Sequence, residues 1–196
     1  MDYSAASVKF LLWYVETRET AKLLEKHTFD EINKMVIEDN LYQQKSRQRM
    51  QSEFGCIKKR LEALPVELAR KMTVADIQTA KIIILIGCMA TDRLLFEVVY
   101  EIYRVKLKYG EEEITDADFN VFFQNKAEQS EKVSGFSIAT IKKLKQTYTR
   151  YLVDVGLICV TDTGKKVGHP FLEPEIRDVL FQNHMDQYWY ALTGEK

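Results

Sequence analysis

Two adjacent segments in the middle of the chain are apolar on nearly every helical face. The first, residues 74–91, contains the nine-residue run IIILIGCMA, and the second, residues 92–110, ends at Gly110. A helix that is apolar all round has to be covered by protein on all sides. The run is far shorter than the roughly 20 apolar residues that a helix needs to cross a bilayer. We therefore expect two central helices of a helical bundle and no membrane anchor.

Composition also favours long helices around a sizeable core. The 196 residues include three prolines and eight glycines, and 46% of the chain is hydrophobic. Such a chain has enough apolar material to fold and few residues that break helices. The cysteines Cys56, Cys88 and Cys159 are scattered and never in CxxC spacing. We therefore expect a reducing cytoplasm, with neither a disulfide framework nor a zinc site. No signal peptide is expected either, because the opening stretch lacks a charged n-region and a cleavage site.

Capping signals divide the N-terminal part of the chain into helices. Thr28 with Glu31 forms a capping box that predicts a helix to about residue 40, and Ser46 begins a longer helix to about residue 64. In the longer helix an apolar stripe follows one helical face: Met50, Phe54, Ile57, Leu61 and Leu64. We expect Pro65 to open a short helix ending near residue 71, and Thr73 with Asp76 to cap the first central helix.

The remaining third of the chain has a different organisation. Thr115 predicts a helix to about residue 127, KAEQSEKV a second short helix, and Ser137 a long helix to Val155 that Gly156 stops. Residues 157–161 and 165–171 are expected to form two strands around an Asp-Thr-Gly turn at 162–164. This is the chain order of a winged helix-turn-helix. The predicted fold class is mainly α: a helical bundle at 1–112, then a winged helix-turn-helix domain with a small β-hairpin and a C-terminal packing helix at 113–196.

The long helix and the hairpin carry a concentration of basic residues in a chain whose formal charge is −1. Within residues 141–170, six basic residues face only two acids, Asp154 and Asp162. Helical spacing puts Ile138, Ile141, Leu144, Tyr148, Tyr151, Leu152 and Val155 on one apolar face. The candidate DNA-binding residues are Lys142, Lys143, Lys145, Gln146, Thr149, Arg150, Lys165 and Lys166. The alternative is that these lysines only solvate an exposed helix.

A second basic cluster belongs to the predicted helix 46–64 and the residues just before it. It contains Lys45, Arg47, Arg49, Lys58, Lys59 and Arg60, against Glu53 alone. These residues fringe the apolar stripe, so solvation and snorkelling of long side chains explain them well. The alternative is an extension of the DNA surface, in which Lys45, Arg47 and Arg49 contact the phosphate backbone.

The sequence contains no signature of a catalytic or cofactor site. It has no phosphate-binding glycine loop, no nucleophile elbow and no H-E-x-x-H motif. The histidines His27, His169 and His184 lie far apart and near no cysteine pair. We expect no enzyme, no cofactor and no metal.

Five fragments taken together resemble the BrxA family, the small component of BREX phage-exclusion systems. They are YSAAS (3–7), IEDNLYQQKSRQRM (37–50), IKKRLEALPVEL (57–68), TDRLLFEVVYEIYR (91–104) and KLKQTYTRYLVDVGLI (143–158). The family often has glycines after its opening Tyr-Ser, where this chain has Ala5 and Ala6. The resemblance implies a non-catalytic, NusB-like and winged-helix protein that acts with other BREX components, including a DNA methyltransferase and ATPases.

Three hypotheses follow. The leading one is a cytoplasmic accessory protein of an anti-phage system that binds double-stranded DNA. The second is a protein-interaction scaffold whose winged helix docks a partner instead of DNA. The third is RNA binding through the NusB-like helical half, which only the resemblance suggests.

Overall fold

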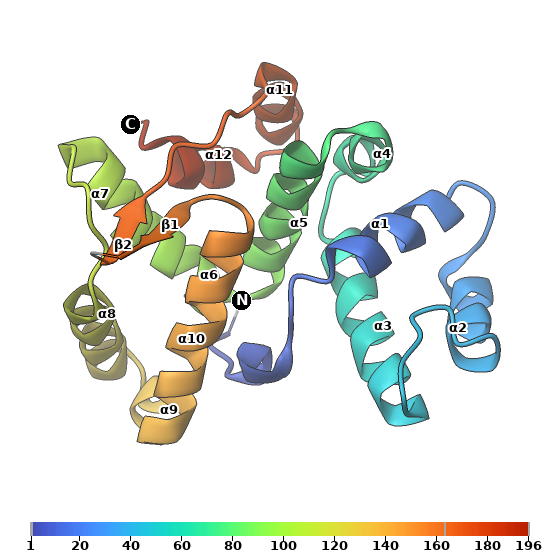
Figure 1. Cartoon of the computed structure of the whole chain (residues 1–196), viewed down its shortest axis with the longest axis horizontal. Coiled ribbons are helices and arrows are strands. Elements are labelled where there is room, and N and C mark those ends of the chain that lie inside the picture. The colour runs from blue at the N-terminus through green and yellow to red at the C-terminus, as the bar shows by residue number, and fades with distance from the viewer. Residues whose placement is uncertain (1, 163, 196) are drawn as a thin grey trace.

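The computed structural model describes residues 2–162 and 164–195 of the chain. Figure 1 shows α5 near the centre, α1 to α4 on one side of it, and α6 to α10 with the hairpin on the other. The first elements are η1 (Ala6–Lys9), α1 (Tyr14–Leu23), α2 (Phe29–Glu38), α3 (Arg47–Glu62), α4 (Val66–Val74), α5 (Ile77–Thr91) and α6 (Arg93–Val98). They are followed by η2 (Val99–Tyr103), α7 (Arg104–Tyr109), α8 (Asp116–Gln129), α9 (Glu131–Ser134), α10 (Ile138–Asp154), β1 (Ile158–Thr161), β2 (Gly164–Val167), α11 (Pro174–Gln182) and α12 (Asp186–Thr193). The prediction of a mainly α fold with a small β-hairpin is confirmed.

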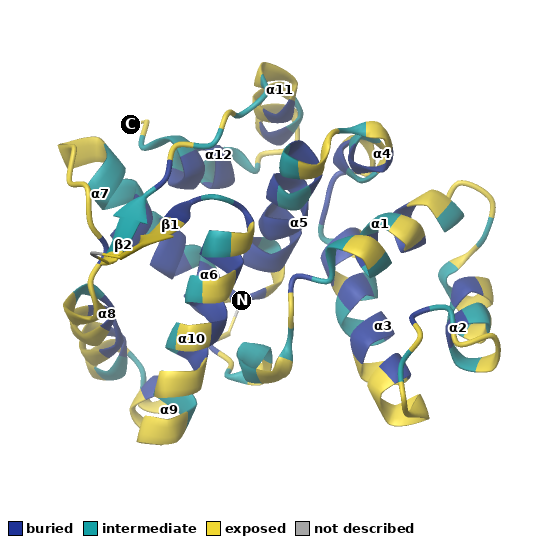
Figure 2. Cartoon of the chain, in the orientation of Figure 1, coloured by how far each residue is buried: buried dark blue, intermediate teal, exposed yellow. Residues whose placement is uncertain are grey.

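Helix α5 forms the centre of the core, as its all-round apolar sequence predicts. It packs against α1, α3, α4 and α6. Every residue from Ile82 to Met89 is buried, which Figure 2 shows as a nearly continuous dark blue helix. Within the described residues, no helix combines the length and the apolar character that crossing a bilayer requires.

Most of the predicted helix starts are confirmed, because the capping side chains make the expected bonds. Thr28 and Thr115 form complete capping boxes, and the Ser46 and Ser137 hydroxyls each accept a backbone N–H in the first turn. The predicted start of α5 was wrong. Asp76 itself is the N-cap and accepts the N–H groups of Gln78 and Thr79, so α5 begins three residues later than expected.

Two neighbouring boundaries also differ from the sequence prediction. Helix α4 continues to Val74 instead of ending near residue 71, and its Thr73 hydroxyl donates to the Arg70 carbonyl rather than capping α5. The first half of the KAEQSEKV stretch belongs to α8, and the short helix α9 is confined to Glu131–Ser134. Ser130 separates the two because its backbone is extended.

The second central segment is one helix with a π-helical middle. Helices α6 and α7 are joined through the π segment η2, and Gly110 ends α7 in the left-handed conformation at φ 67°. The π segment packs against α8 and α12. Its Tyr103 hydroxyl donates to the Gly168 carbonyl at 2.8 Å. This buried bond ties the central helix to the chain that leaves the hairpin.

The hairpin is shorter than predicted and gains a third, irregular edge. Strands β1 and β2 pair antiparallel from Ile158 opposite Val167 to Thr161 opposite Gly164. The backbone of residues 112–114 runs beside β2, since Ile114 donates to the Lys165 carbonyl and Val167 donates to the Glu112 carbonyl. The predicted turn at 162–164 includes Thr163, which lies outside the described residues. The assignment as a winged helix-turn-helix and the domain division after residue 112 remain predictions.

A buried carboxylic acid lies in the corner formed by α1, α2 and α3. Glu53 of α3 is 3% exposed, and no described group forms a hydrogen bond with its Oε1. Burial, together with the nearby Glu16 carboxylate, raises the pKa of Glu53 from 4.5 to about 7. The folded protein therefore holds this proton more tightly than the unfolded chain does, so stability falls as the pH rises from about 4.5 through about 7.

We predict that Glu53→Gln flattens this pH dependence. The amide is a neutral isostere of the protonated acid, so the variant and the wild type should have similar stability at pH 5. At pH 8 the variant should be more stable by on the order of 2 kcal/mol, because no buried carboxylate has to ionise. Urea unfolding of both proteins at the two pH values measures this difference. An unchanged difference between pH 5 and pH 8 would contradict the prediction.

Candidate nucleic-acid interface

Helix α10 has two chemically different faces, as its sequence predicts. Its inner face is buried and consists of Leu144, Tyr148, Tyr151 and Leu152, followed by Val155 at the C-cap. Its outer face exposes Lys142, Lys143, Gln146 and Arg150 to solvent. Figure 2 shows this outer face in yellow and teal on the side of α10 toward the viewer. The amphipathic pattern therefore fixes which side chains of α10 are available to a partner.

Two residues of the predicted apolar stripe are not buried, since Ile141 is half-buried and Ile138 is exposed. Ile138 is 88% exposed, whereas the sequence placed it on the face with Leu144 and Tyr148. It is the first residue of α10 and has no preceding helical turn to shelter it. At 100° per residue it lies directly before Lys142 on the outer face. The prediction for Ile138 was therefore wrong.

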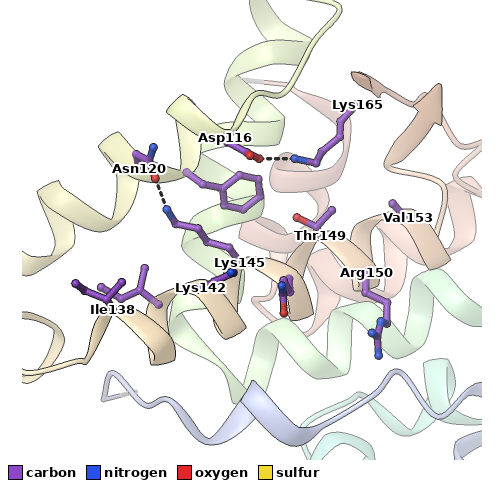
Figure 3. A pocket seen from close by; sticks show the side chains of 12 residues that line it. Asp116, Asn120, Ile138, Lys142, Lys145, Thr149, Arg150, Val153 and Lys165 are labelled. Carbon is purple, nitrogen blue, oxygen red and sulfur yellow. Dashed lines mark hydrogen bonds and ion pairs between the residues drawn. The ribbon is translucent and has the colours of Figure 1, made fainter. Parts of the chain in front are cut away.

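The outer face of α10 forms one wall of a hollow of about 890 Å³. Helix α8 and the start of β2 provide the other walls. Figure 3 shows the side chains around this hollow, which we call the α8–α10 groove. Six of the predicted DNA-binding residues line it: Lys142, Lys145, Gln146, Thr149, Arg150 and Lys165. Lys143 lies outside the lining, on the flank of the helix.

Three groove residues from α8 were not identified from the sequence. Asp116, Phe119 and Asn120 face α10 across the groove, and two of them hold a predicted lysine. The Lys165 ammonium forms an ion pair with Asp116, and the Lys145 ammonium donates to the Asn120 side-chain carbonyl (Figure 3). The hydrogen bond and charge of Lys165 hold the pKa of Asp116 below its usual range. Asp116, the first residue of α8, therefore neutralises a lysine of the hairpin.

The basic residues consequently divide into two groups. Lys165 is paired with Asp116, and the Lys166 ammonium lies 4.0 Å from Glu112. By contrast, Lys142, Lys143 and Arg150 have no carboxylate within 4 Å in the described part of the chain. In Figure 3, Arg150 points away from the Asp116–Lys165 pair. The uncompensated positive charge of this surface therefore lies on α10 and not on the hairpin.

The second basic cluster lies elsewhere. Lys45, Arg47 and Arg49 are exposed around the N-terminus of α3, and none of them lines the α8–α10 groove. In the view of Figure 1, η1 lies between this end of α3 and α10. The structure thus does not bring the three residues into the groove. Arg60, assigned from the sequence to the same solvated fringe, is 3% exposed, so that interpretation was wrong for Arg60.

The N-terminal segment forms hydrogen bonds on the buried side of this surface. The Ser7 hydroxyl donates to Asp92, and the Tyr148 hydroxyl of α10 donates to the same carboxylate at 3.0 Å. The Tyr3 hydroxyl donates to Glu97 at 3.0 Å, while the Arg93 guanidinium lies 4.1 Å from the Tyr3 ring centroid. The YSAAS and TDRLLFE fragments therefore meet at two hydrogen-bonded groups, one around Asp92 and one around Glu97. Sequence reasoning missed them, because neither fragment alone indicates its partner.

The described residues contain no group of three or more histidine, cysteine, aspartate or glutamate side chains that could hold a metal ion. The three free cysteines differ in burial: Cys88 is buried, Cys56 is half-buried and Cys159 is exposed. The side chains that line the α8–α10 groove supply ammonium, guanidinium, amide and hydroxyl groups, together with the Asp116 carboxylate. The first four kinds of group bind phosphates and donate to base edges.

The fold and this surface define a class of mainly helical proteins that present a basic long helix beside a β-hairpin. The chain belongs to the BrxA family, whose sequence profile matches residues 1–184, so the resemblance seen in the sequence is confirmed. A relative from Bacillus cereus (strain H3081.97), described as BREX protein BrxA, is 34% identical over 185 residues, which cover 94% of this chain and 92% of the relative. A crystal structure of an uncharacterized protein from Magnetospirillum magneticum matches with a TM-score of 0.83 at 19% identity. That match covers 98% of this chain and 99% of the other, and it shows the fold alone.

The opposite faces of α10 predict opposite responses to truncation. Leu144→Ala should lower the free energy of unfolding by about 2–5 kcal/mol, because it leaves a cavity in the core. Ile138→Ala should change it by less than about 0.5 kcal/mol, because this side chain is exposed. Urea unfolding of both variants measures the contrast. Equal losses of stability would place Ile138 back on the buried face.

Proposed function

We propose that the protein is a non-catalytic accessory component of a BREX phage-exclusion system that binds double-stranded DNA through α10. The observation that carries the proposal is the outer stripe of α10. Lys142, Gln146 and Arg150 line one groove there, and within residues 2–162 and 164–195 no carboxylate pairs with either of the two cations. Membership of the BrxA family supports the role in a BREX system. The proposal includes a cytoplasmic location and action alongside a DNA methyltransferase and ATPases.

The dimensions and chemistry of α10 support insertion into the major groove. Its 17 residues extend over about 25 Å at 1.5 Å per residue, and the major groove is about 12 Å wide and admits one helix. Gln146 and Arg150 are the side-chain types that pair with adenine and guanine edges, while Lys142 and Lys143 neutralise phosphates. The adjacent hairpin would then lie beside the backbone, in the arrangement of a winged helix-turn-helix.

The hairpin lysines can contact DNA phosphates only if they leave their carboxylate partners. Lys165 and Lys166 face Asp116 and Glu112, so a phosphate has to compete with a carboxylate for each ammonium group. Asp116 is exposed and belongs to the first turn of α8, so it also repels an approaching phosphate directly. We therefore assign the main electrostatic contribution to α10 and a smaller one to the hairpin. Lys45, Arg47 and Arg49 remain candidates for a separate backbone contact.

A protein-interaction scaffold is the second candidate function. It is favoured by exposed apolar side chains at both ends of the basic surface, Ile138 at 88% and Val160 of β1 at 66%. Such residues suit an apolar docking surface. The two functions differ in salt dependence, because phosphate contacts weaken steeply as salt rises whereas apolar docking does not. RNA binding through the helical half is separated from both by comparing duplex DNA with duplex RNA.

We predict that the double variant Lys142→Glu/Lys143→Glu loses binding to duplex DNA while remaining folded. Both side chains are exposed, and acids in the early turns of a helix are compatible with its dipole. For the wild type, the log–log plot of affinity against salt should have a slope of about 0.9 per phosphate contact. Fluorescence anisotropy with a labelled duplex across a salt series measures both the affinity and the slope.

The matched control is Lys26→Glu/Lys34→Glu, which makes the same change in net charge at exposed positions outside the groove. It should retain most of the duplex affinity. Phage plating efficiency of cells carrying each double variant then tests the defence role. If the α10 variant loses DNA binding but still excludes phage, the scaffold function is favoured. If its duplex affinity equals that of the wild type, the assignment of α10 is wrong.

Asp116→Asn should strengthen duplex binding. The substitution frees the Lys165 ammonium and removes a negative charge from the groove wall, while keeping the shape of the side chain. The expected gain is about 3- to 10-fold at low salt, because one rim charge changes the association rate more than the contact energy. Anisotropy titrations of wild type and variant at two salt concentrations measure it. Weaker binding by the variant would show that Asp116 organises the groove instead of competing with phosphate.

A further inference from the structure

A second cavity lies beneath the N-terminal segment, apart from the α8–α10 groove. It has a volume of about 370 Å³ and is enclosed by residues 4–10, α3, α5 and the inner face of α10. Its α3 wall is a polar stripe that includes Gln51, Ser52 and Lys59, and Phe10 and Leu95 provide apolar surface. This mixture of a few polar groups and apolar walls is typical of a small-molecule site.

A buried arginine with unused donors lines this cavity. Arg60 is 3% exposed and carries a full positive charge, yet the described chain places no carboxylate within 4 Å of it. Its Nη1 donates to the Leu11 and Leu12 carbonyls, and its Nη2 donates to the Tyr151 hydroxyl. Three of five N–H groups are therefore matched, and Nε–H and one Nη2–H have no acceptor among the described residues. A buried guanidinium with unmatched N–H groups favours the binding of an anion that accepts hydrogen bonds from them.

Asp92, the carboxylate in the cavity wall, does not accept the remaining hydrogen bonds of Arg60. Asp92 already accepts hydrogen bonds from the Ser7 hydroxyl, the Tyr148 hydroxyl and the Leu95 N–H. Lys59 adds a second positive charge to the α3 wall, and it is exposed. The cavity therefore has an excess of positive charge that the chain itself does not neutralise.

A glycine in the α3 wall keeps the cavity open. Gly55 lies in the middle of α3, where glycine lowers helix stability relative to alanine. No atom lies within 4 Å of the position its Cβ would occupy, so tight packing does not require glycine there. Gly87 of α5 shows the contrast, since its Cβ would lie 2.9 Å from the Arg60 carbonyl oxygen. Close helix packing explains Gly87, whereas Gly55 borders open space in the cavity.

We propose that this cavity binds a small organic oxyanion, whose carboxylate or phosphate group accepts hydrogen bonds from Arg60 and whose body lies over Gly55. The inference is independent of DNA binding, because the two sites share no lining residue. The ligand would bridge Arg60 and the N-terminal segment that covers the cavity. Binding should therefore hold residues 4–10 more firmly against α3 and α10.

The test is a titration of the full-length protein followed by ¹H–¹⁵N NMR, with the Arg60 Nε–H resonance as the direct reporter. Adenosine 5′-monophosphate represents organic phosphates, benzoate represents organic carboxylates, and inorganic phosphate represents the headgroup alone. Each is added at constant ionic strength, with chloride as the reference. At least one organic anion should shift the Arg60 resonance saturably, and more strongly than inorganic phosphate does.

The matched variant is Gly55→Leu: the added Cβ has no atom within 4 Å, the longer side chain takes up space in the cavity, and leucine favours the helix. It should weaken binding by about 10-fold or more, which corresponds to at least 1.4 kcal/mol. The Lys142→Glu/Lys143→Glu variant should bind the anion as the wild type does, because its changes lie outside the cavity. The proposal is overturned if none of the three anions shifts the Arg60 resonance saturably, or if Gly55→Leu binds as tightly as the wild type.

Discussion

The structure depends on one buried guanidinium that joins three parts of the chain. Arg60 of α3 lies between the rings of Trp13 and Tyr151, at 5.5 and 5.6 Å from their centroids, and donates to the carbonyls of Leu11 and Leu12. These contacts replace part of the hydration that the cation loses on burial. They also hold Trp13 in the left-handed conformation at φ 52°, which an aromatic residue rarely adopts. The N-terminal segment, α3 and α10 are thereby fixed by a single side chain, and the strained residue that begins α1 is stabilised by the same contact.

The sequence predicted the elements that local chemistry determines. Thr28, Ser46, Thr115 and Ser137 cap helices because a hydroxyl reaches backbone N–H groups within its own first turn, and this requires no tertiary partner. The exposed lysines of α10 follow in the same way from helical periodicity. The misassigned residues, Thr73, Ile138 and Arg60, failed for different reasons. Asp76, three residues further along, caps α5 instead of Thr73. No preceding turn shelters Ile138, and the carbonyls that bind Arg60 are 48 and 49 residues away in sequence.

The candidate interface also contains contacts that the sequence alone could not predict. Periodicity predicted which α10 residues face outward, and four of them line the α8–α10 groove: Lys142, Gln146, Thr149 and Arg150. It could not show that Asp116 holds Lys165, because the two residues are 49 positions apart and the chain forms α8, α9, α10 and β1 before it reaches Lys165. The net charge of a sequence stretch counts the lysines of α10 and those of the hairpin equally. The structure separates them, since the hairpin cations are paired with acids and the α10 cations have no carboxylate partner among the described residues.

The two faces of α10 make opposite demands on the protein, and the N-terminal segment reconciles them. The outer cations repel one another and gain nothing from the fold, so their charge remains available to a polyanion. The inner tyrosines have to satisfy their hydroxyl groups in the core: Tyr148 donates to Asp92, and Tyr151 donates to the Leu11 carbonyl while accepting from Arg60. Ser7 and Leu11 of the N-terminal segment meet α10 at these same two points. The orientation of the basic face is therefore set from behind, by buried hydrogen bonds to the first residues of the chain, and not by the charges that face the solvent.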